Sequence, residues 1–205
     1  MPLDITQEDF LTPTQVLALK EHCRRAAEAT ASAQARAVRN WAILHVALDA
    51  GLRVSEICAL RVEDLVLDGS PASLVVRDGK GHRKRGVHVG DALRRHLEQY
   101  LAWKEDLGEP AAPQSALFLS SRGDGPLTRT AVFRIFKEAA RAVGLPARFS
   151  IHSCRHTYAS LLYRASRYNL RLVQKELGHR SIQTTQIYAD VLSEDAAVAV
   201  NALPQ

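Results

Sequence analysis

The run WAILHVAL, residues 41–48, is the feature that most constrains how this chain can fold. It is apolar nearly all the way round a helix, and a helix without a polar face has to be buried on all sides. Gly51 follows closely and is a residue that commonly ends helices. The sequence therefore predicts a central buried helix over about residues 35–50, with the other elements packed around it.

Further helices are predicted on both sides of this central one. In LTPTQV, Thr12 can cap a helix, Pro13 suits its first turn and Gln15 completes a capping box, so a helix should run to about residue 30. Periodic apolar residues and end signals predict the others, at about 53–60, 91–101 and 129–143, followed by short helices at 152–166, 170–177, 181–188 and 194–201.

Two short strands are predicted in the first half of the chain. SLVVR (73–77) and KRGVHV (84–89) are rich in strand-forming residues, and DGKGH between them has the turn residues of a hairpin. ALFLS (116–120) is a candidate third strand. The expected fold class is therefore mainly α with a small antiparallel β-sheet (α+β).

The charge balance indicates a nucleic-acid partner. The formal net charge of the 205-residue chain is +5, and of its 27 basic residues 21 are Arg and 6 are Lys. The planar guanidinium can grip two phosphate oxygens at once, so an Arg-rich basic domain fits nucleic-acid binding. A GC-rich genome would also favour Arg over Lys, so the bias alone does not decide.

Other classes of protein fit the sequence less well. The chain has no apolar run long enough to span a membrane and no signal peptide at its start. Its three cysteines, Cys23, Cys58 and Cys154, are scattered and odd in number. We therefore expect reduced thiols in a cytoplasmic protein, with neither a disulfide framework nor a zinc site.

Two motifs in the first half carry candidate site residues. GLRVSEI places Arg53 directly after the buried helix and its Gly turn, although a surface Arg at a helix start is common. DGKGHRKR places Lys80 at the tip of the predicted hairpin, where a solvated lysine is the ordinary alternative.

Two more motifs lie in the second half. HSCRH places His152 and Arg155 three residues apart on one face of a helix opening. His152 and His156 could instead ligate a metal, but no third ligand is fixed nearby. ELGHRSIQTTQIY places His179 after a Gly turn and Tyr188 nine residues later, where a partly buried aromatic residue is the plain alternative.

The four motifs together resemble the catalytic domain of the tyrosine recombinases, the phage-integrase family. GLRVSEICALRVEDL, GKG, HSCRHTYAS and LGHRSIQTTQIY occur in the order of that family, and the last two are highly specific in combination. The resemblance covers about residues 10–192. It implies an N-terminal extension (1–10), a catalytic domain (11–192) and a C-terminal helical tail (193–205) that could be exchanged between subunits.

The resemblance also implies an active site for DNA cleavage. Tyr188 would be the nucleophile, His152 would handle its proton, Lys80 would protonate the leaving 5′ oxygen, and His156 would pack or hydrogen-bond behind them. The residues implied around one scissile phosphate are Arg53, Lys80, His152, Arg155 and His179. Neither a cofactor nor a metal ion is implied, because the covalent phosphotyrosine stores the energy of the broken bond.

The implied partner is double-stranded DNA, on which subunits of the family associate into a tetrameric synapse. Full-length members carry an N-terminal DNA-clamping domain, so the sequence resembles either part of a longer protein or a short fimbrial-type invertase. Two other functions stay open: a DNA-binding regulator with a helix-turn-helix near residue 180, and a type IB topoisomerase activity.

Overall fold

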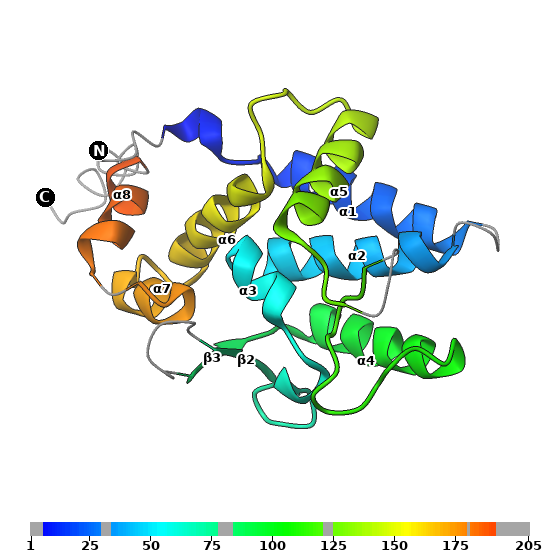
Figure 1. Cartoon of the computed structure of the whole chain (residues 1–205). Helices are drawn as coiled ribbons and strands as arrows, with labels where there is room; N and C mark the ends of the chain where they lie inside the picture. The colour runs from blue at the N-terminus through cyan, green and yellow to red at the C-terminus, as the bar shows by residue number, and fades with distance from the viewer. Residues whose placement is uncertain (1–5, 30–33, 78–83, 121–124, 180, 192–205) are drawn as a thin grey trace, which may run out of the picture.

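The computed structural model describes residues 6–29, 34–77, 84–120, 125–179 and 181–191. Helices form most of the domain and a three-stranded antiparallel sheet lies at one edge, which confirms the predicted fold class (Figure 1). The α-helices are α1 (Pro13–Glu28), α2 (Gln34–Asp49), α3 (Val54–Ala59), α4 (Asp91–Asp106), α5 (Arg129–Ala142), α6 (Ile151–Ala165), α7 (Leu170–Leu177) and α8 (Gln183–Val191). Two 3₁₀ turns are η1 (Gln7–Asp9) and η2 (Val62–Asp64).

Helix α2 lies at the centre of the fold, as its apolar sequence predicts. Residues 42–48 are all buried, and the helix contacts α1, α3, α4, α5 and α6. Each Ile, Leu or Val side chain that is fully buried in this way contributes about 1.5–3 kcal/mol, because its apolar surface is removed from water. Burial on every side makes α2 the rigid base from which the loop to α3 emerges.

Gly51 ends α2 and shapes that loop. Its φ is +58°, in the region that favours glycine, and a Cβ at this position would overlap the ring of Tyr158 on α6. The loop can therefore pass directly against α6. The backbone carbonyl of Gly51 accepts a hydrogen bond from the Arg155 side chain, so the end of α2 also helps to build the site described below.

The start of α1 has the predicted capping box. The Thr12 hydroxyl accepts a hydrogen bond from the Gln15 backbone N–H at 3.2 Å, and the Gln15 side chain accepts one from the Thr12 N–H at 2.9 Å. Pro13 is the first helical residue. The local sequence thus determines where this helix begins.

The sheet consists of β1 (Leu65–Val66), β2 (Ser73–Arg77) and β3 (Lys84–His88), in that order. The predicted strand pair is confirmed, with Val75 opposite Gly86 and Arg77 opposite Lys84. The turn at 78–83 lies outside the described residues.

The predicted third strand at 116–120 is wrong. This segment makes only isolated bridges, and the third strand of the sheet is β1, which pairs with β2 on the other edge. Leu117 and Phe118 are buried in the main core, and the Leu117 carbonyl accepts a hydrogen bond from the Tyr100 hydroxyl. The apolar pattern there reflects a buried loop whose backbone is partly satisfied by a side chain.

Helices α6, α7 and α8 pack together at the other end of the molecule (Figure 1). Their contact surfaces form a second, small apolar cluster of Ala159, Val173, Leu177 and Tyr188. The tail at 193–205, with its predicted helix, lies outside the described residues. Among the helices that are described, none is long and apolar enough to cross a membrane.

Candidate active site

Five of the six predicted site residues lie in the described part of the chain, on four separate segments. Arg53 precedes α3, His152 and Arg155 are on α6, His179 follows α7, and Tyr188 is on α8. The sixth, Lys80, falls in residues 78–83, which lie outside the described residues. The contacts of α6 with α7 and α8 bring distant parts of the sequence to one region.

Arg155 is the buried centre of this region, with 6% of its surface exposed. Its guanidinium donates to the Gly51 carbonyl at 2.7 Å and to the Leu177 carbonyl at 2.8 Å. Burial first, and then the neighbouring Arg53, lower the pKa of Arg155 to about 10, so it remains a cation at neutral pH. A buried cation held by two neutral carbonyls is well placed to receive an anion.

Arg53 is the more exposed of the two arginines, with 42% of its side chain accessible. Its guanidinium donates to the Glu56 carboxylate at 2.9 Å, and its backbone N–H donates to the same group at 2.8 Å. Glu56 thus caps the start of α3 while it orients Arg53. This replaces the usual small polar cap and explains how an Arg is tolerated at a helix start.

Glu56 also binds an arginine from the sheet. Arg85 on β3 donates to both carboxylate oxygens, at 2.9 and 3.0 Å, and Arg155 lies 3.9 Å from the same group. Burial is the largest single influence and raises the pKa of Glu56, but the hydrogen bonds and charges of Arg85 and Arg53 together outweigh it, so the net pKa is lowered. One carboxylate therefore faces three guanidinium groups, which leaves a local excess of positive charge.

His179 is fixed by the element that follows it. Its Nδ1 lies 2.9 Å from the hydroxyl of Thr185, which is fully buried on α8. Its ring is parallel to that of Tyr188 within 11°, with ring centroids 6.5 Å apart. Burial, and secondly Arg155, lower its pKa to about 4, so His179 is neutral at neutral pH.

Tyr188 is almost completely buried, with 1% exposed. Its hydroxyl lies 3.0 Å from Nδ1 of His156. Burial raises the pKa of this tyrosine to about 12, although Arg155 and Arg53 partly oppose the increase. Burial also lowers the pKa of His156 to about 4. At neutral pH this is therefore a hydrogen bond between a neutral phenol and a neutral imidazole.

His152 lies one turn before His156 on the exposed side of α6. Its ring packs edge-on against Phe133 of α5, with centroids 5.5 Å apart. Burial, followed by the charge of Arg155, lowers its pKa. Of the two α6 histidines, it is His156 rather than His152 that contacts the Tyr188 hydroxyl in the described structure.

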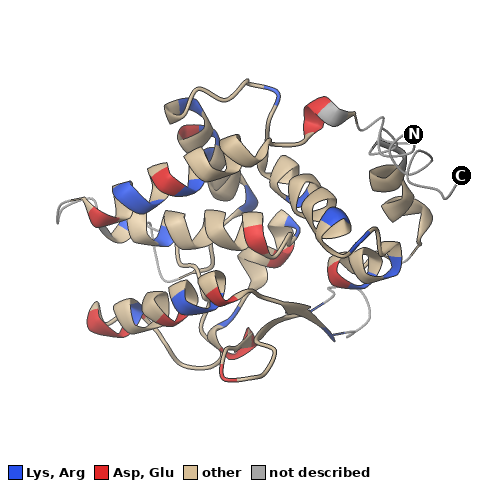
Figure 2. Cartoon of the chain, turned by 180° about the vertical axis from the view of Figure 1, so that it is seen from behind, with Lys and Arg blue, Asp and Glu red and all other residues tan. Residues whose placement is uncertain are grey.

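The charge elsewhere on the surface is mixed. Figure 2 shows basic and acidic residues interleaved along α1 and α4, where Arg24 pairs with Glu28 and Arg94 with Glu98. Such exposed pairs neutralise each other. Within the described ranges, no three His, Cys, Asp or Glu side chains are grouped so that they could hold a metal ion.

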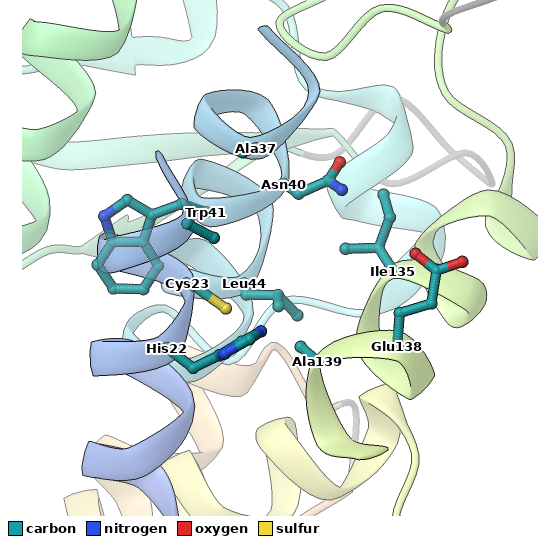
Figure 3. Close-up of a pocket in the computed structure, with 10 residues that line it drawn as sticks. His22, Cys23, Ala37, Asn40, Trp41, Leu44, Ile135, Glu138 and Ala139 are labelled. Atoms are coloured by element: carbon teal, nitrogen blue, oxygen red, sulfur yellow. The ribbon is translucent and has the colours of Figure 1, made fainter. Parts of the chain in front are cut away.

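A cavity of about 170 Å³ lies away from this region, between α1, α2 and α5 (Figure 3). Its lining includes Cys23, Leu44 and Ile135, with His22 and Glu138 as its ionisable groups. Neither Arg155 nor any other predicted site residue lines it. The candidate site thus combines a buried arginine, neutral histidines and a buried tyrosine, and it is separate from this cavity.

The comparisons with known proteins identify the family of the chain. A model of the phage integrase family matches residues 9–195, which is nearly the whole chain. The chain belongs to the phage integrase family. A tyrosine recombinase of Pseudothermotoga lettingae is 34% identical over 197 residues, which cover 96% of this chain and 61% of that protein. The tyrosine recombinase XerD of Bradyrhizobium diazoefficiens is 41% identical, with 82% of this chain and 54% of that protein covered.

Solved structures of phage integrase family members have the same fold. The crystal structure of XerA recombinase matches 96% of this chain and 65% of its own, with a TM-score of 0.77 and 26% identity. The XerH recombinase, solved in a complex with its difH substrate, gives a TM-score of 0.76 at 24% identity. The chain spans about half the length of the curated relatives that it matches.

Two residues of the site are absent from the sequence prediction. Glu56 lies three residues after Arg53 in the GLRVSEI motif, so helix periodicity could have placed it beside the arginine. Arg85 is one of several basic residues in HRKR, and only strand pairing decides that it faces Glu56.

Proposed function

We propose that this family member is a site-specific DNA recombinase that cuts and rejoins DNA through a covalent 3′-phosphotyrosine. The observation that carries the proposal is the convergence of Arg53, Arg155, His179 and Tyr188 from four segments of the chain. XerH, one of the structural neighbours, was solved with a DNA substrate before cleavage. The residues gathered here suit a phosphodiester for the following chemical reasons.

Attack on a phosphodiester concentrates negative charge on the non-bridging oxygens. Arg53 and Arg155 supply fixed guanidinium donors for those oxygens, and one donor of this kind lowers the barrier by about 3–4 kcal/mol. In the cleavage step, the Tyr188 oxygen bonds to phosphorus and the bond to the 5′ oxygen of the next nucleotide breaks. The tyrosine loses a proton and the leaving oxygen gains one, so the step needs a base and an acid.

The remaining residues suit these proton transfers. His152, next to Arg155 on α6, is the proposed base for the tyrosine proton. Lys80, in the turn between β2 and β3, is the proposed acid for the leaving oxygen. The Nδ1 of His179 is engaged by Thr185, which leaves Nε2 to bind a phosphate oxygen. Rejoining reverses the step with a 5′-hydroxyl as nucleophile, so no external energy source is needed.

Tyr188 has to become accessible before it can act. With 1% of its surface exposed and its hydroxyl bound to His156, it cannot reach a phosphate in the described conformation. Helix α8 carries the tyrosine and is the last described element. DNA binding must therefore shift α8, or at least the Tyr188 side chain, out of the small cluster with Ala159 and Val173.

The proposed domain organisation is the one that the motif resemblance implies. Residues 11–192 form the catalytic domain, 1–10 an extension, and 193–205 a tail that could dock on a neighbouring subunit. We propose double-stranded DNA as the partner, with several subunits assembled on adjacent half-sites, and the cytoplasm as the place of action.

The test is trapping on a suicide DNA substrate, in which a nick lets the short 5′ strand diffuse away after cleavage. The wild-type chain should give a denaturation-resistant protein–DNA adduct, and Tyr188→Phe should bind DNA without forming one. An adduct from the Phe variant would remove Tyr188 from its role. Binding without any adduct in wild type would favour a DNA-binding regulator, and resealing without exchange between two marked duplexes would favour a topoisomerase.

A further inference from the structure

Arg85, on β3, contacts two elements of the candidate site, α3 and the end of α7, although none of the motifs singles it out. Its fork binds both oxygens of Glu56, and its Nε lies 3.5 Å from the Glu176 carbonyl at the end of α7. Only 20% of its side chain is exposed. A planar two-bond pair of this kind fixes the direction of both partners.

The turn after α7 is shaped to fit Arg85. Gly178 has a φ of +65°, and a Cβ there would lie 2.6–2.8 Å from Nε, Cδ and Cζ of Arg85. The arginine therefore lies across the bare backbone that leads directly into His179. Arg85 thus contacts the start of α3 on one side and the turn that carries His179 on the other.

A second pair holds β3 against α7 beside Arg85. Glu176, with 4% exposed, binds the backbone N–H of His88 at 3.0 Å and its Nδ1 at 2.6 Å. The backbone on which Arg85 stands is therefore held to α7 independently of Arg85. Removing the Arg85 side chain should leave this clamp between strand and helix in place.

Glu56, the partner of Arg85, also lies close to both proposed phosphate donors. Glu56 is 2.9 Å from Arg53 and 3.9 Å from Arg155, the two proposed phosphate donors. If Arg85 did not occupy both carboxylate oxygens, the buried anion would draw these two guanidiniums toward itself. A phosphate would then compete with Glu56 for the same donors.

We propose that Arg85 is a positioning residue for DNA cleavage, which satisfies Glu56 so that Arg53 and Arg155 remain available to the scissile phosphate. This inference rests on the proposed recombinase function and extends it to a residue outside the six motif positions. Arg85 acts through Glu56 and has no contact of its own with the reacting atoms.

The test is a double-mutant cycle on the rate of adduct formation, measured in single turnover with saturating protein. Arg85→Ala should slow cleavage about tenfold. The double variant, which also carries Glu56→Gln, should lose less than the product of the two single losses, as expected for residues in one network. DNA affinity should stay within about twofold in all three variants, because the proposed effect lies after binding. Arg94→Ala, which removes an exposed ion pair on α4, is the matched control and should leave the rate unchanged.

If the two rate losses multiply, Arg85 and Glu56 act independently and the proposal is wrong. Weaker DNA binding at an unchanged cleavage rate would also overturn it, and would make Arg85 a DNA anchor. If Arg85→Ala does not fold, Arg85→Lys takes its place, since it keeps the charge without the two-bond fork. A readout without DNA is the Glu56 pKa followed by side-chain ¹³C NMR, which should rise in either Arg85 variant. If wild type forms no adduct, the proposed function fails, and an unchanged Glu56 pKa would separately contradict the inference.

Discussion

The hydroxyl of Tyr188 and Nδ1 of His156 lie 3.0 Å apart, inside a cluster where only 1% of the tyrosine is exposed. With the His156 pKa lowered to about 4 by burial, the imidazole is neutral and can accept the phenol proton in a hydrogen bond. The bond stabilises the tyrosine in a position from which it cannot attack DNA. His156 therefore holds the inactive position of the proposed nucleophile.

Replacing His156 should loosen that position. His156→Phe fills similar space but leaves the buried hydroxyl without its acceptor, which costs about 1–3 kcal/mol. We expect faster nitration of Tyr188 in the absence of DNA, measured by peptide mass spectrometry. Tyr100, which is equally buried and bonds to the Leu117 carbonyl, is the internal control. Equal nitration of Tyr188 in wild type and variant would show that His156 does not hold the tyrosine.

The two proposed phosphate donors should affect rate more than binding. Arg53→Ala and Arg155→Ala should each slow adduct formation by about 10²-fold or more, as expected for loss of a transition-state donor. DNA affinity should fall much less, because many other basic residues can contact phosphates. Single-turnover cleavage and equilibrium binding separate the two quantities. Equal losses in both would mean that these arginines merely anchor the DNA.

Thermal unfolding must accompany these measurements, because the two arginines differ in burial. Arg155 is buried and bonded to the Gly51 and Leu177 carbonyls, so its loss should also lower stability. Arg53 is 42% exposed in its side chain, so its loss should hardly do so.

The sequence predicted the elements whose signals are local, and missed what depends on distant contacts. The capping box at Thr12 and the buried run 42–48 are encoded within a few residues, and both were predicted. The apolar segment 116–120 reads the same whether it forms a strand or a buried loop. Its loop conformation depends on a hydrogen bond from Tyr100, well away in the sequence.

The site shows the same division. The motifs predict Arg155 and Tyr188 as site residues because their spacing is characteristic, but the role of Arg85 depends on the register of β3 against β2. The burial of Tyr188 likewise arises from the packing of α8 on α6 and α7. Neither can be read from a motif, because each depends on how separate elements meet.

Lys80 should act on the leaving group. If sulfur replaces the 5′ bridging oxygen of the substrate, the leaving group departs without needing a proton, because a thiol is a far stronger acid than an alcohol. The sulfur substrate should therefore restore adduct formation by Lys80→Ala while Arg155→Ala stays impaired. The measurement is the ratio of cleavage rates on sulfur and oxygen substrates for each variant. A similar ratio for both variants would make the acid assignment wrong.

Folding stability should fall as the pH is lowered from about 6.5 toward 4. Burial lowers the pKa values of His96, His156 and His179 to about 4 in the folded chain, from an ordinary value of 6.5. Between these values the unfolded chain binds protons that the folded chain does not, so acid favours unfolding. Stability is therefore full above about pH 6.5 and is lost progressively below it.

Urea unfolding at about pH 7 and about pH 5 measures this effect, because most carboxylates are still ionised at both values. His96 is on α4, where its Nδ1 lies 2.8 Å from that of His45 on α2, and it is remote from the proposed chemistry. His96→Asn should weaken the pH dependence without abolishing it. A free energy of unfolding that is the same at both pH values would contradict the assignment of buried neutral histidines.

The last prediction concerns how firmly this chain alone holds DNA. A catalytic domain that covers one side of the duplex makes fewer phosphate contacts than a protein that surrounds it, and each neutralised phosphate adds about 0.9 to the slope of log affinity against log salt. The chain spans about half the length of its curated relatives. We therefore expect weak binding by the monomer, with a shallower salt dependence than that of a protein that surrounds the duplex, and with little sequence discrimination.

Stable complexes should need several subunits, because linking weak contacts on adjacent half-sites raises the effective concentration of each. Gel-shift and sedimentation experiments at several salt concentrations, on one half-site and then on two inverted half-sites, measure this directly. Two half-sites should bind more than twice as tightly as one, with two subunits in the sedimenting complex. Tight binding of a monomer to one half-site, with a steep salt dependence, would contradict the prediction, and would mean that this chain already surrounds enough of the duplex by itself.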